Sequence, residues 1–208
     1  MSNIVISQKS GRTAAEGRED LILDAVDRLL ARYGYKKMTI DDLAKEAGIG
    51  KGTVYLHFKS KEDVVFSHVD RIVRRLLERL QVIIQGEGEP AEKVRQMLLL
   101  RVMFRFDSVQ HFTESVSEVL RDLRPRMLER RQRYFEDEAK VFAVVIREGQ
   151  RTKLFRGQDP LATARTLILA TNSLLPFSLS TQELGKRREV EQSALRIAEL
   201  VLQGLLSR

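Results

Sequence analysis

Apolar residues recur with the period of an α-helix along most of the chain. Between Arg18 and Gly34 they are spaced by three, four, seven and eight residues, positions that lie on one face of a helix. No stretch shows the sustained alternation of apolar and polar residues that is typical of a half-buried strand. The pattern therefore predicts an all-α protein with about nine helices.

Proline, glycine and short polar stretches divide this pattern into separate helices. Pro90, Pro125 and Pro160 stand where new helices are expected to begin, a position at which the missing N–H of proline costs little. Gly34 and Gly48 stand where helices are expected to end. The expected helices span residues 18–34, 39–48, 50–57, 60–85, 90–106, 109–123, 125–151, 160–178 and 187–206.

The second and third of these helices are short, and the tight turn Gly48-Ile49-Gly50 joins them. Thr39 and Asp42 have the spacing of a capping box, which marks the start of the second helix. Two short helices joined by a glycine-containing turn predict a helix-turn-helix. In that motif the second helix enters the major groove of DNA.

The third helix and the helix starts around it carry the groups expected at DNA. Lysine ammonium groups would neutralise phosphates, and the hydroxyl groups of Thr53 and Tyr55 would bond to phosphates or base edges. The N–H groups at the starts of the second and fourth helices would point at phosphates. The plainer alternative is a solvated helix with a partly buried tyrosine. The expected DNA-binding residues are Thr39, Gly50, Lys51, Gly52, Thr53, Tyr55, Leu56, His57 and Lys61.

The segment from Thr39 to Asp63 resembles the DNA-binding signature of the TetR family of transcriptional regulators. The resemblance extends back over residues 22–35 and covers roughly residues 15–66, under a third of the chain. One position departs from the family pattern, which often has serine or another polar residue before the recognition lysine. This chain has Ile49-Gly50 there. The departure removes one expected side-chain contact and so leaves fewer side chains to recognise bases.

The resemblance implies an N-terminal three-helix DNA-binding domain and a C-terminal helical domain that binds a ligand and dimerises. In the family, ligand binding shifts the fourth helix and so changes the spacing of the two recognition helices across a pseudo-palindromic operator. The expected organisation is a flexible arm over 1–15, the DNA-binding domain over 16–62 and the effector-binding and dimerisation domain over 63–208. The expected function is that of a repressor released from double-stranded operator DNA by a small hydrophobic or amphipathic effector.

The last two long helices are apolar over much of their surface, which indicates burial on two sides. Ordinary core within one chain would explain this pattern. A two-fold four-helix interface explains it better, because the pseudo-palindromic operator that the resemblance implies requires a symmetric dimer. The residues expected at the homodimer interface are Leu167, Thr171, Leu174, Ala194, Ile197, Val201 and Leu205.

Polar side chains interrupt the apolar faces of several C-terminal helices, and a polar group on such a face is costly unless it is paired. One interpretation is that these groups orient an effector. The other, slightly favoured, is that Arg101 and Glu138, or similar pairs, satisfy each other, and that the phenylalanines are core. The candidate effector-binding residues are Arg101, Phe104, Phe112, Glu138, Phe142 and Asn172.

The net charge of the chain is +7, which permits DNA or another anionic partner. Lys and Arg only slightly outnumber Asp and Glu between Lys9 and Glu62, so the overall charge does not locate the DNA-binding region. Much of the surplus lies in the arginines of residues 121–133. We interpret that run as a solvated face rather than a membrane-docking surface.

The chain has no cysteine, three scattered histidines and no motif of a familiar enzyme class. We therefore expect no enzymatic activity, no cofactor and no metal site. The absence of a long apolar run and of a secretion signal favours a cytoplasmic protein without membrane contact. Two other classes stay open: a DNA-binding activator or architectural protein without an effector and, more remotely, an enzyme built on a helical bundle.

Overall fold

A computed structural model describes the protein over residues 14–109, 122–175 and 181–206. Within these ranges the chain is helical almost throughout, and the only extended pairing is an isolated bridge between Phe155 and Leu206. The all-α prediction is therefore confirmed. Nearly all of the arm expected at 1–15, and of the helix expected at 109–123, lies outside the described residues.

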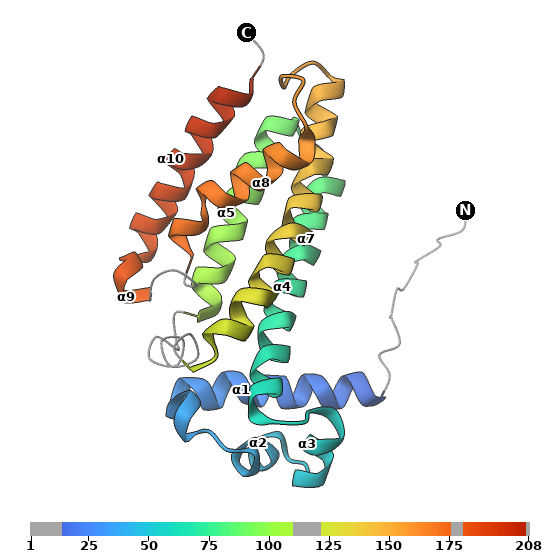
Figure 1. Ribbon diagram of the computed structural model, residues 1–208, viewed down its shortest axis with the longest axis vertical. Coiled ribbons are helices and arrows are strands. Elements are labelled where there is room, and N and C mark those ends of the chain that lie inside the picture. Colours follow the sequence, from blue (N-terminus) through green and yellow to red (C-terminus); the bar gives the residue numbers. More distant parts are fainter. Residues whose placement is uncertain (1–13, 110–121, 176–180, 207–208) are drawn as a thin grey trace, which may run out of the picture.

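The first helices lie together at one end of the molecule, and a bundle of longer helices extends away from them (Figure 1). α4 belongs to both parts, because it packs against α1 at this end and against α5 and α7 in the bundle. The elements that form this end and its connection to the bundle are α1 (Ala14–Lys37), α2 (Ile40–Ala47), α3 (Lys51–His57) and α4 (Lys61–Gln85).

The bundle is built on α5 and α7, which pack against each other and against α4. α8 lies along α7, and α10 lies along α5. The bundle elements are α5 (Pro90–Val109), α7 (Arg124–Arg151), α8 (Pro160–Ala170), the 3-10 turn η2 (Asn172–Leu174), α9 (Thr181–Leu184) and α10 (Arg187–Leu205).

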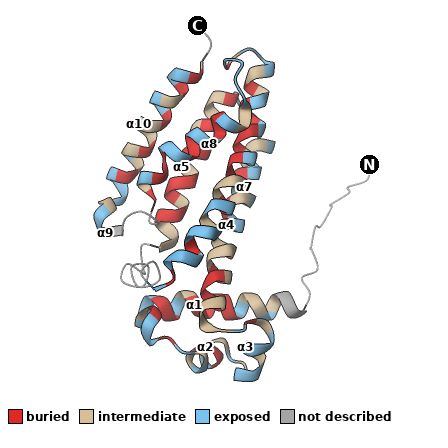
Figure 2. Cartoon of the chain, in the orientation of Figure 1, coloured by how far each residue is buried: buried red, intermediate tan, exposed pale blue. Residues whose placement is uncertain are grey.

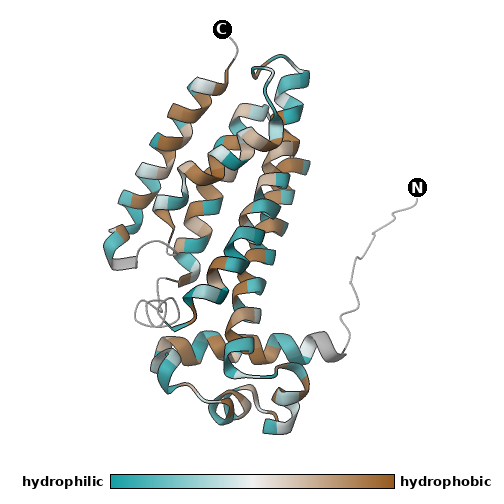
Figure 3. Cartoon of the chain, viewed as in Figure 1, coloured by the Kyte–Doolittle hydropathy of each residue, from teal (hydrophilic) through white to brown (hydrophobic). Residues whose placement is uncertain are grey.

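Buried apolar side chains form a core in each part of the molecule (Figure 2). The hydrophobic positions of the bundle helices largely coincide with the buried ones (Figure 3). The N-terminal core joins α1, α2, α3 and the first turns of α4, and it includes Leu123 and Met127 from the start of α7. Both α4 and α7 therefore connect the bundle to the N-terminal helices. None of the described helices combines the length and apolar character needed to span a membrane.

One expected helix ends early. The sequence pattern predicts a helix over 160–178, but α8 stops at Ala170 and the short turn η2 follows. Leu175 is extended (φ −104°, ψ 144°), as expected for a residue that precedes a proline, here Pro176. The Thr171 hydroxyl also bonds to the carbonyl groups of Leu167 and Ile168, a local bond that competes with continued helix.

A buried charge network occupies the centre of the bundle beside this break. Arg101 donates from Nε to Glu138 (2.6 Å), from Nη1 to the Thr171 hydroxyl (2.6 Å) and from Nη2 to the Asn172 amide oxygen (2.7 Å). Arg105 donates to both carboxylate oxygens of Glu138. Because Arg101 and Glu138 are fully buried, each charge depends on the other for its stability.

The protonation states follow from these contacts. Burial lowers the pKa of Arg101 to about 10, which still leaves it charged at neutral pH. Burial raises the pKa of Glu138, but the charges of Arg105 and Arg101 and their hydrogen bonds outweigh this, so the pKa of Glu138 lies below its usual value. The network therefore holds one carboxylate between two guanidinium groups.

We expect Glu138→Gln to lower the free energy of unfolding by about 3–5 kcal/mol, because it leaves Arg101 buried without a counter-charge. Glu136→Gln is the matched control, since Glu136 lies on the same helix and pairs with Arg165 at the surface. The exposed pair should matter little. Denaturant unfolding of both variants tests this, and equal stabilities would contradict the assigned importance of the buried network.

Candidate nucleic-acid interface and its connection to the bundle

α2 and α3 form a helix-turn-helix. Thr39 caps α2 by accepting a hydrogen bond from the Asp42 amide, and the Asp42 carboxylate accepts one from the Thr39 amide. Gly48 ends α2 in the left-handed region (φ 68°), a conformation that glycine adopts without strain. Its N–H then donates to the carbonyl groups of Ala44 and Lys45. The turn expected from the sequence is thus present.

The buried side of α3 fixes which side faces solvent. Val54 is fully buried and Phe58 nearly so, and both pack in the N-terminal core with Leu43 of α2. Side chains three and four positions apart share a face of a helix. The opposite face of α3 is therefore exposed, and its members are Lys51, Gly52, Tyr55 and Leu56.

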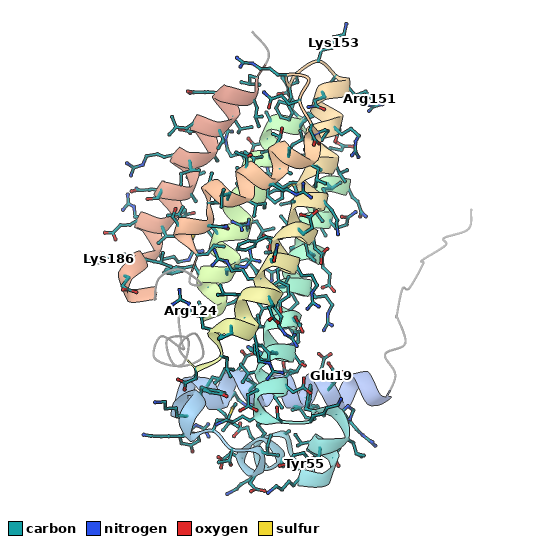
Figure 4. The ribbon with its side chains drawn as sticks, viewed as in Figure 1. Glu19, Tyr55, Arg124, Arg151, Lys153 and Lys186 are labelled. Carbon is teal, nitrogen blue, oxygen red and sulfur yellow. The ribbon has the colours of Figure 1, made fainter. Side chains whose placement is uncertain are left out.

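The exposed face of α3 carries large side chains at the end of the molecule. Tyr55 is 51% exposed and Leu56 83% exposed. Tyr55 lies at the end of the molecule opposite Arg151 and Lys153 (Figure 4). Thr53 and His57 are half-buried at the edges of this face. Five expected DNA-binding residues of α3 (Lys51, Gly52, Thr53, Tyr55 and Leu56) thus lie together, with His57 beside them.

The two lysines expected at phosphates have partners within the protein. Lys51 donates to Asp41 of α2 (2.9 Å), and this hydrogen bond and the Asp41 charge raise the pKa of Lys51. Lys61 donates to the carbonyl groups of Tyr35 (3.1 Å) and Lys36 (3.4 Å), at the end of α1.

Lys61 also contacts an aromatic ring of α1. Its ammonium group lies 4.5 Å from the centre of the Tyr35 ring. The carbonyl groups at a helix end need donors, and the positively charged side chain of Lys61 supplies them. The geometry assigns Lys61 to the junction of α1 and α4. Thr39 likewise uses its hydroxyl as a helix cap.

The candidate effector residues are divided between the charge network and the core. Arg101, Glu138 and Asn172 belong to the buried network, in which they bond to one another as the second interpretation of the sequence states. Phe142 is fully buried in the bundle core. Phe104 is half-buried, and the Arg79 guanidinium lies 4.8 Å from its ring centre. Phe112 lies outside the described residues.

Most of the residues expected at the dimer interface point into their own chain. Leu167, Thr171, Ala194 and Leu205 are all buried within it, so the apolar face chosen from the sequence is largely the inward one. The helical pattern alone does not distinguish the core from an interface. Leu174, Ile197 and Val201 are half-buried. The outward faces of these helices carry the strongly exposed Leu169 (70%) and Leu200 (71%).

A buried arginine that the sequence analysis did not single out joins α4 to α1. Arg71 is 1% exposed and lies against three carboxylates of one α1 face, those of Asp20, Asp24 and Asp27. Its shortest bond is to Asp24 (2.7 Å). His68 of α4 adds a 3.0 Å contact from Nε2 to Asp27. The regular spacing of the three aspartates was the available signal.

The neighbouring residue on α4 makes the opposite connection. Asp70 accepts hydrogen bonds from Arg130 and Tyr134 of α7. The guanidinium of Arg130 also lies 4.6 Å from the ring centre of the fully buried Phe66. Adjacent residues of α4 therefore bind charged partners on α1 and on α7. We call Phe66, His68, Asp70 and Arg71 the α4 junction.

The N-terminal helices form a helix-turn-helix whose second helix faces solvent, and one long helix joins them to an α-helical bundle. This arrangement is typical of the N-terminal DNA-binding domain of bacterial regulators. Residues 22–67 match the family model described as bacterial regulatory proteins, tetR family. This N-terminal segment is therefore of the TetR-family type, as its sequence signature suggested.

Curated relatives match part of the chain. The chain is 31% identical over 115 residues to the fatty acid metabolism regulator protein of Bacillus subtilis, covering 55% of this chain and 57% of that one. It is 40% identical over 68 residues to the HTH-type transcriptional regulator EthR of Mycolicibacterium smegmatis, covering 33% and 31%. The matched segments therefore span less than two thirds of the length of these relatives.

Solved structures extend the likeness to the bundle. A transcriptional regulator of the TetR/AcrR family from Thermobifida fusca has a TM-score of 0.64 at 27% identity, over 90% of this chain and 98% of that one. A transcriptional regulator from Cytophaga hutchinsonii has a TM-score of 0.76 over 92% and 100%, at 18% identity, which supports the fold alone.

We expect Arg71→Met to lower the free energy of unfolding by roughly 1.5–3 kcal/mol at neutral pH, because it removes charge-assisted hydrogen bonds to the α1 aspartates. Arg74→Met is the matched control, since Arg74 lies exposed on the same helix. Denaturant unfolding of the full chain measures both.

Acid should reduce this difference. Burial raises the pKa of Asp27, but the hydrogen bond and charge of His68 and the charges of Arg71 and Arg75 outweigh burial, so its pKa lies below the ordinary 3.8. The stability that Asp27 contributes is therefore complete above its unfolded pKa and is lost as pH falls through the lower folded value. A gap between wild type and Arg71→Met that stays constant down to pH 2 would contradict the assignment.

Proposed function

We propose that this protein is a sequence-specific DNA-binding transcriptional regulator that acts as a homodimer. The observation that carries the proposal is the exposed face of α3, which the helix-turn-helix holds at one end of the molecule. A recognition helix of this kind inserts its exposed face into the major groove. Tyr55 and Thr53 would bond to phosphates or base edges there, and the backbone at Gly50 and Gly52 would lie close to DNA.

Lys51 would exchange its partner when DNA binds. In the free protein the ammonium group is held by Asp41 at 2.9 Å, and both side chains are largely exposed. An exposed pair of this kind is weak, so a DNA phosphate can replace the carboxylate. Asp41 would then lie near the DNA backbone and repel it.

We further propose that the regulator is a repressor released by a small effector bound in the bundle. The α4 junction supports such coupling, because Asp70 is bonded to α7 and Arg71 to α1. A shift of α7 would thus be passed through adjacent residues of one helix to the DNA-binding helices. Coupling of this kind is reciprocal, so operator DNA should weaken effector binding by the factor by which the effector weakens operator binding.

A DNA-binding protein without an effector is the second candidate. The observation that favours it is that the Nε and both Nη atoms of Arg101 already have acceptors within the chain, so this arginine needs no ligand as a partner. The two candidates differ in one measurement: for a regulator without an effector, no small molecule that binds the bundle changes operator affinity.

Selection from a pool of random duplex DNA should recover a palindrome whose half-sites lie about one helical turn apart. On that sequence we expect Lys51→Met to weaken binding and to reduce the slope of log K against log salt by about 1.8, the value for one lost phosphate contact in each of the two protomers. Asp41→Asn should strengthen binding by several-fold, because it removes both the competitor for Lys51 and a nearby negative charge.

Recovery of no preferred sequence would contradict the function proposed here. If a palindrome is found but Lys51→Met keeps the full salt slope, Lys51 does not contact phosphate.

The outward faces of α8 and α10 are the proposed dimer interface, in place of the inward face chosen from the sequence. Leu200 is 71% exposed, and half-buried Ile197 and Val201 share its side of α10. Gly204 continues this stripe, and a Cβ atom built on it meets nothing within 4 Å, so a second helix could approach closely there. Leu169 supplies the corresponding exposed side chain on α8.

We expect Leu200→Arg to convert the dimer into monomers and to weaken operator binding, because a charge would lie in an apolar contact. Val82→Arg is the matched control, since Val82 is 68% exposed on α4, away from this face. Sedimentation velocity measures the assembly state. A Leu200→Arg protein that sediments as wild type would exclude this surface as the interface.

A further inference from the structure

Gly52 lies within α3, and nothing in the fold of the chain requires glycine at this position. It is the second residue of α3 and is exposed, and a Cβ atom built on it meets nothing within 4 Å. Its backbone is helical and not in the left-handed region, so any L-residue could adopt it. Glycine within a helix is less favourable than alanine. The absence of a side chain at this position therefore points to something outside the chain that approaches closely.

Leu56 follows Gly52 by one helical turn on the same exposed face. At 83% it is the most exposed of the large apolar side chains among the described residues. Together the two residues form an apolar step, with a bare backbone at Gly52 and the branched side chain of Leu56 beside it. We call this pair the apolar step of α3.

The polar groups around this step are poorly placed to identify bases. Lys51 is expected to bind a phosphate when DNA replaces Asp41, and the half-buried His57 lies against Phe58, with 6.2 Å between the ring centres. Gly50 and Gly52 provide no side chains. Among the residues of α3, Thr53 and Tyr55 carry hydroxyl groups that could bond to bases. Discrimination by hydrogen bonds is therefore limited on this face.

We propose that the apolar step of α3 recognises the C5-methyl group of thymine in the major groove and so selects T·A over C·G at the base pair it meets. The inference rests on the DNA-binding function proposed above. Thymine presents a methyl group in the major groove, and small apolar side chains contact it. The methyl group would lie over the bare backbone of Gly52 and against the side chain of Leu56, where water is displaced from both.

The expected effect is modest for each base and larger for the dimer. Removing one buried methyl group weakens binding about fourfold, and removing it from both half-sites weakens binding by about 10- to 20-fold. The effect must depend on Leu56, which distinguishes direct contact from a change in the shape of the DNA.

Uracil in place of thymine removes only the methyl group, which makes it the appropriate probe. The operator recovered by selection is synthesised with uracil at each thymine in turn, symmetrically in both half-sites, and binding of the full-length dimer is measured at fixed salt. One symmetrical pair of positions should lose about 10- to 20-fold in affinity for the wild-type protein. Leu56→Ala should bind the thymine and uracil operators equally, while Val82→Ala should behave as wild type.

Gly52→Ala separates recognition from folding. The added methyl group meets no atom of the protein, so the variant should melt at a higher temperature than wild type. It would occupy the space required by the thymine methyl, so affinity should fall at least tenfold and the thymine–uracil difference should shrink. A loss of binding in a more stable protein is not explained by unfolding.

The outcomes separate this inference from the function on which it rests. If the wild-type protein selects no sequence, both are overturned. If it binds a palindrome and uracil is tolerated at every position, the methyl contact alone is overturned. An effect of uracil that persists unchanged in Leu56→Ala also overturns it, because the methyl group would then act through another residue or through DNA shape.

Discussion

The buried guanidinium of Arg71 is the contact on which the arrangement of the two parts depends. It is almost completely excluded from solvent, yet its partners are carboxylates at the surface of α1. A buried cation of this kind is stable only where its counter-charges are held, so α1 has one favourable position against α4. Apolar contacts alone would permit small sliding movements of α1. This ionic contact therefore acts together with the apolar N-terminal core to orient the DNA-binding helices relative to the bundle.

The α7 side of the α4 junction is ionic and aromatic as well. Asp70 binds Arg130 and Tyr134, and Phe66 packs beneath the guanidinium of Arg130. Burial and the hydrogen bond to Asp70 raise the pKa of Tyr134 to about 12, so this phenol stays protonated and donates. The two parts of the molecule are thus joined through hydrogen bonds and ion pairs. Such bonds are directional, so they are either formed with one partner or exchanged for another. Such bonds suit a protein that must change between two states.

Local features of the sequence predicted the DNA-binding end well, and long-range contacts account for what they missed. Thr39, Asp42 and Gly48 act within a few residues of themselves, so their roles were readable from spacing. The contacts that Lys61 makes within the chain could not be predicted in this way, because its partners lie at the end of α1. The helical pattern could not separate core positions of α8 and α10 from a dimer interface, because only the packing of α8 against α7 and of α10 against α5 shows which apolar positions face the core.

The closed network around Arg101 restricts the chemistry of any small molecule that enters the centre of the bundle. Separating Arg101 from Glu138, Thr171 or Asn172 would leave guanidinium N–H groups without acceptors in a region that excludes water. A hydrocarbon cannot replace those acceptors. A compound that displaces this network must carry its own oxygen atoms at matching positions, whereas a purely apolar compound has to bind beside the network and leave it intact. The polarity of a bound compound would thus reveal whether it had opened the centre of the bundle.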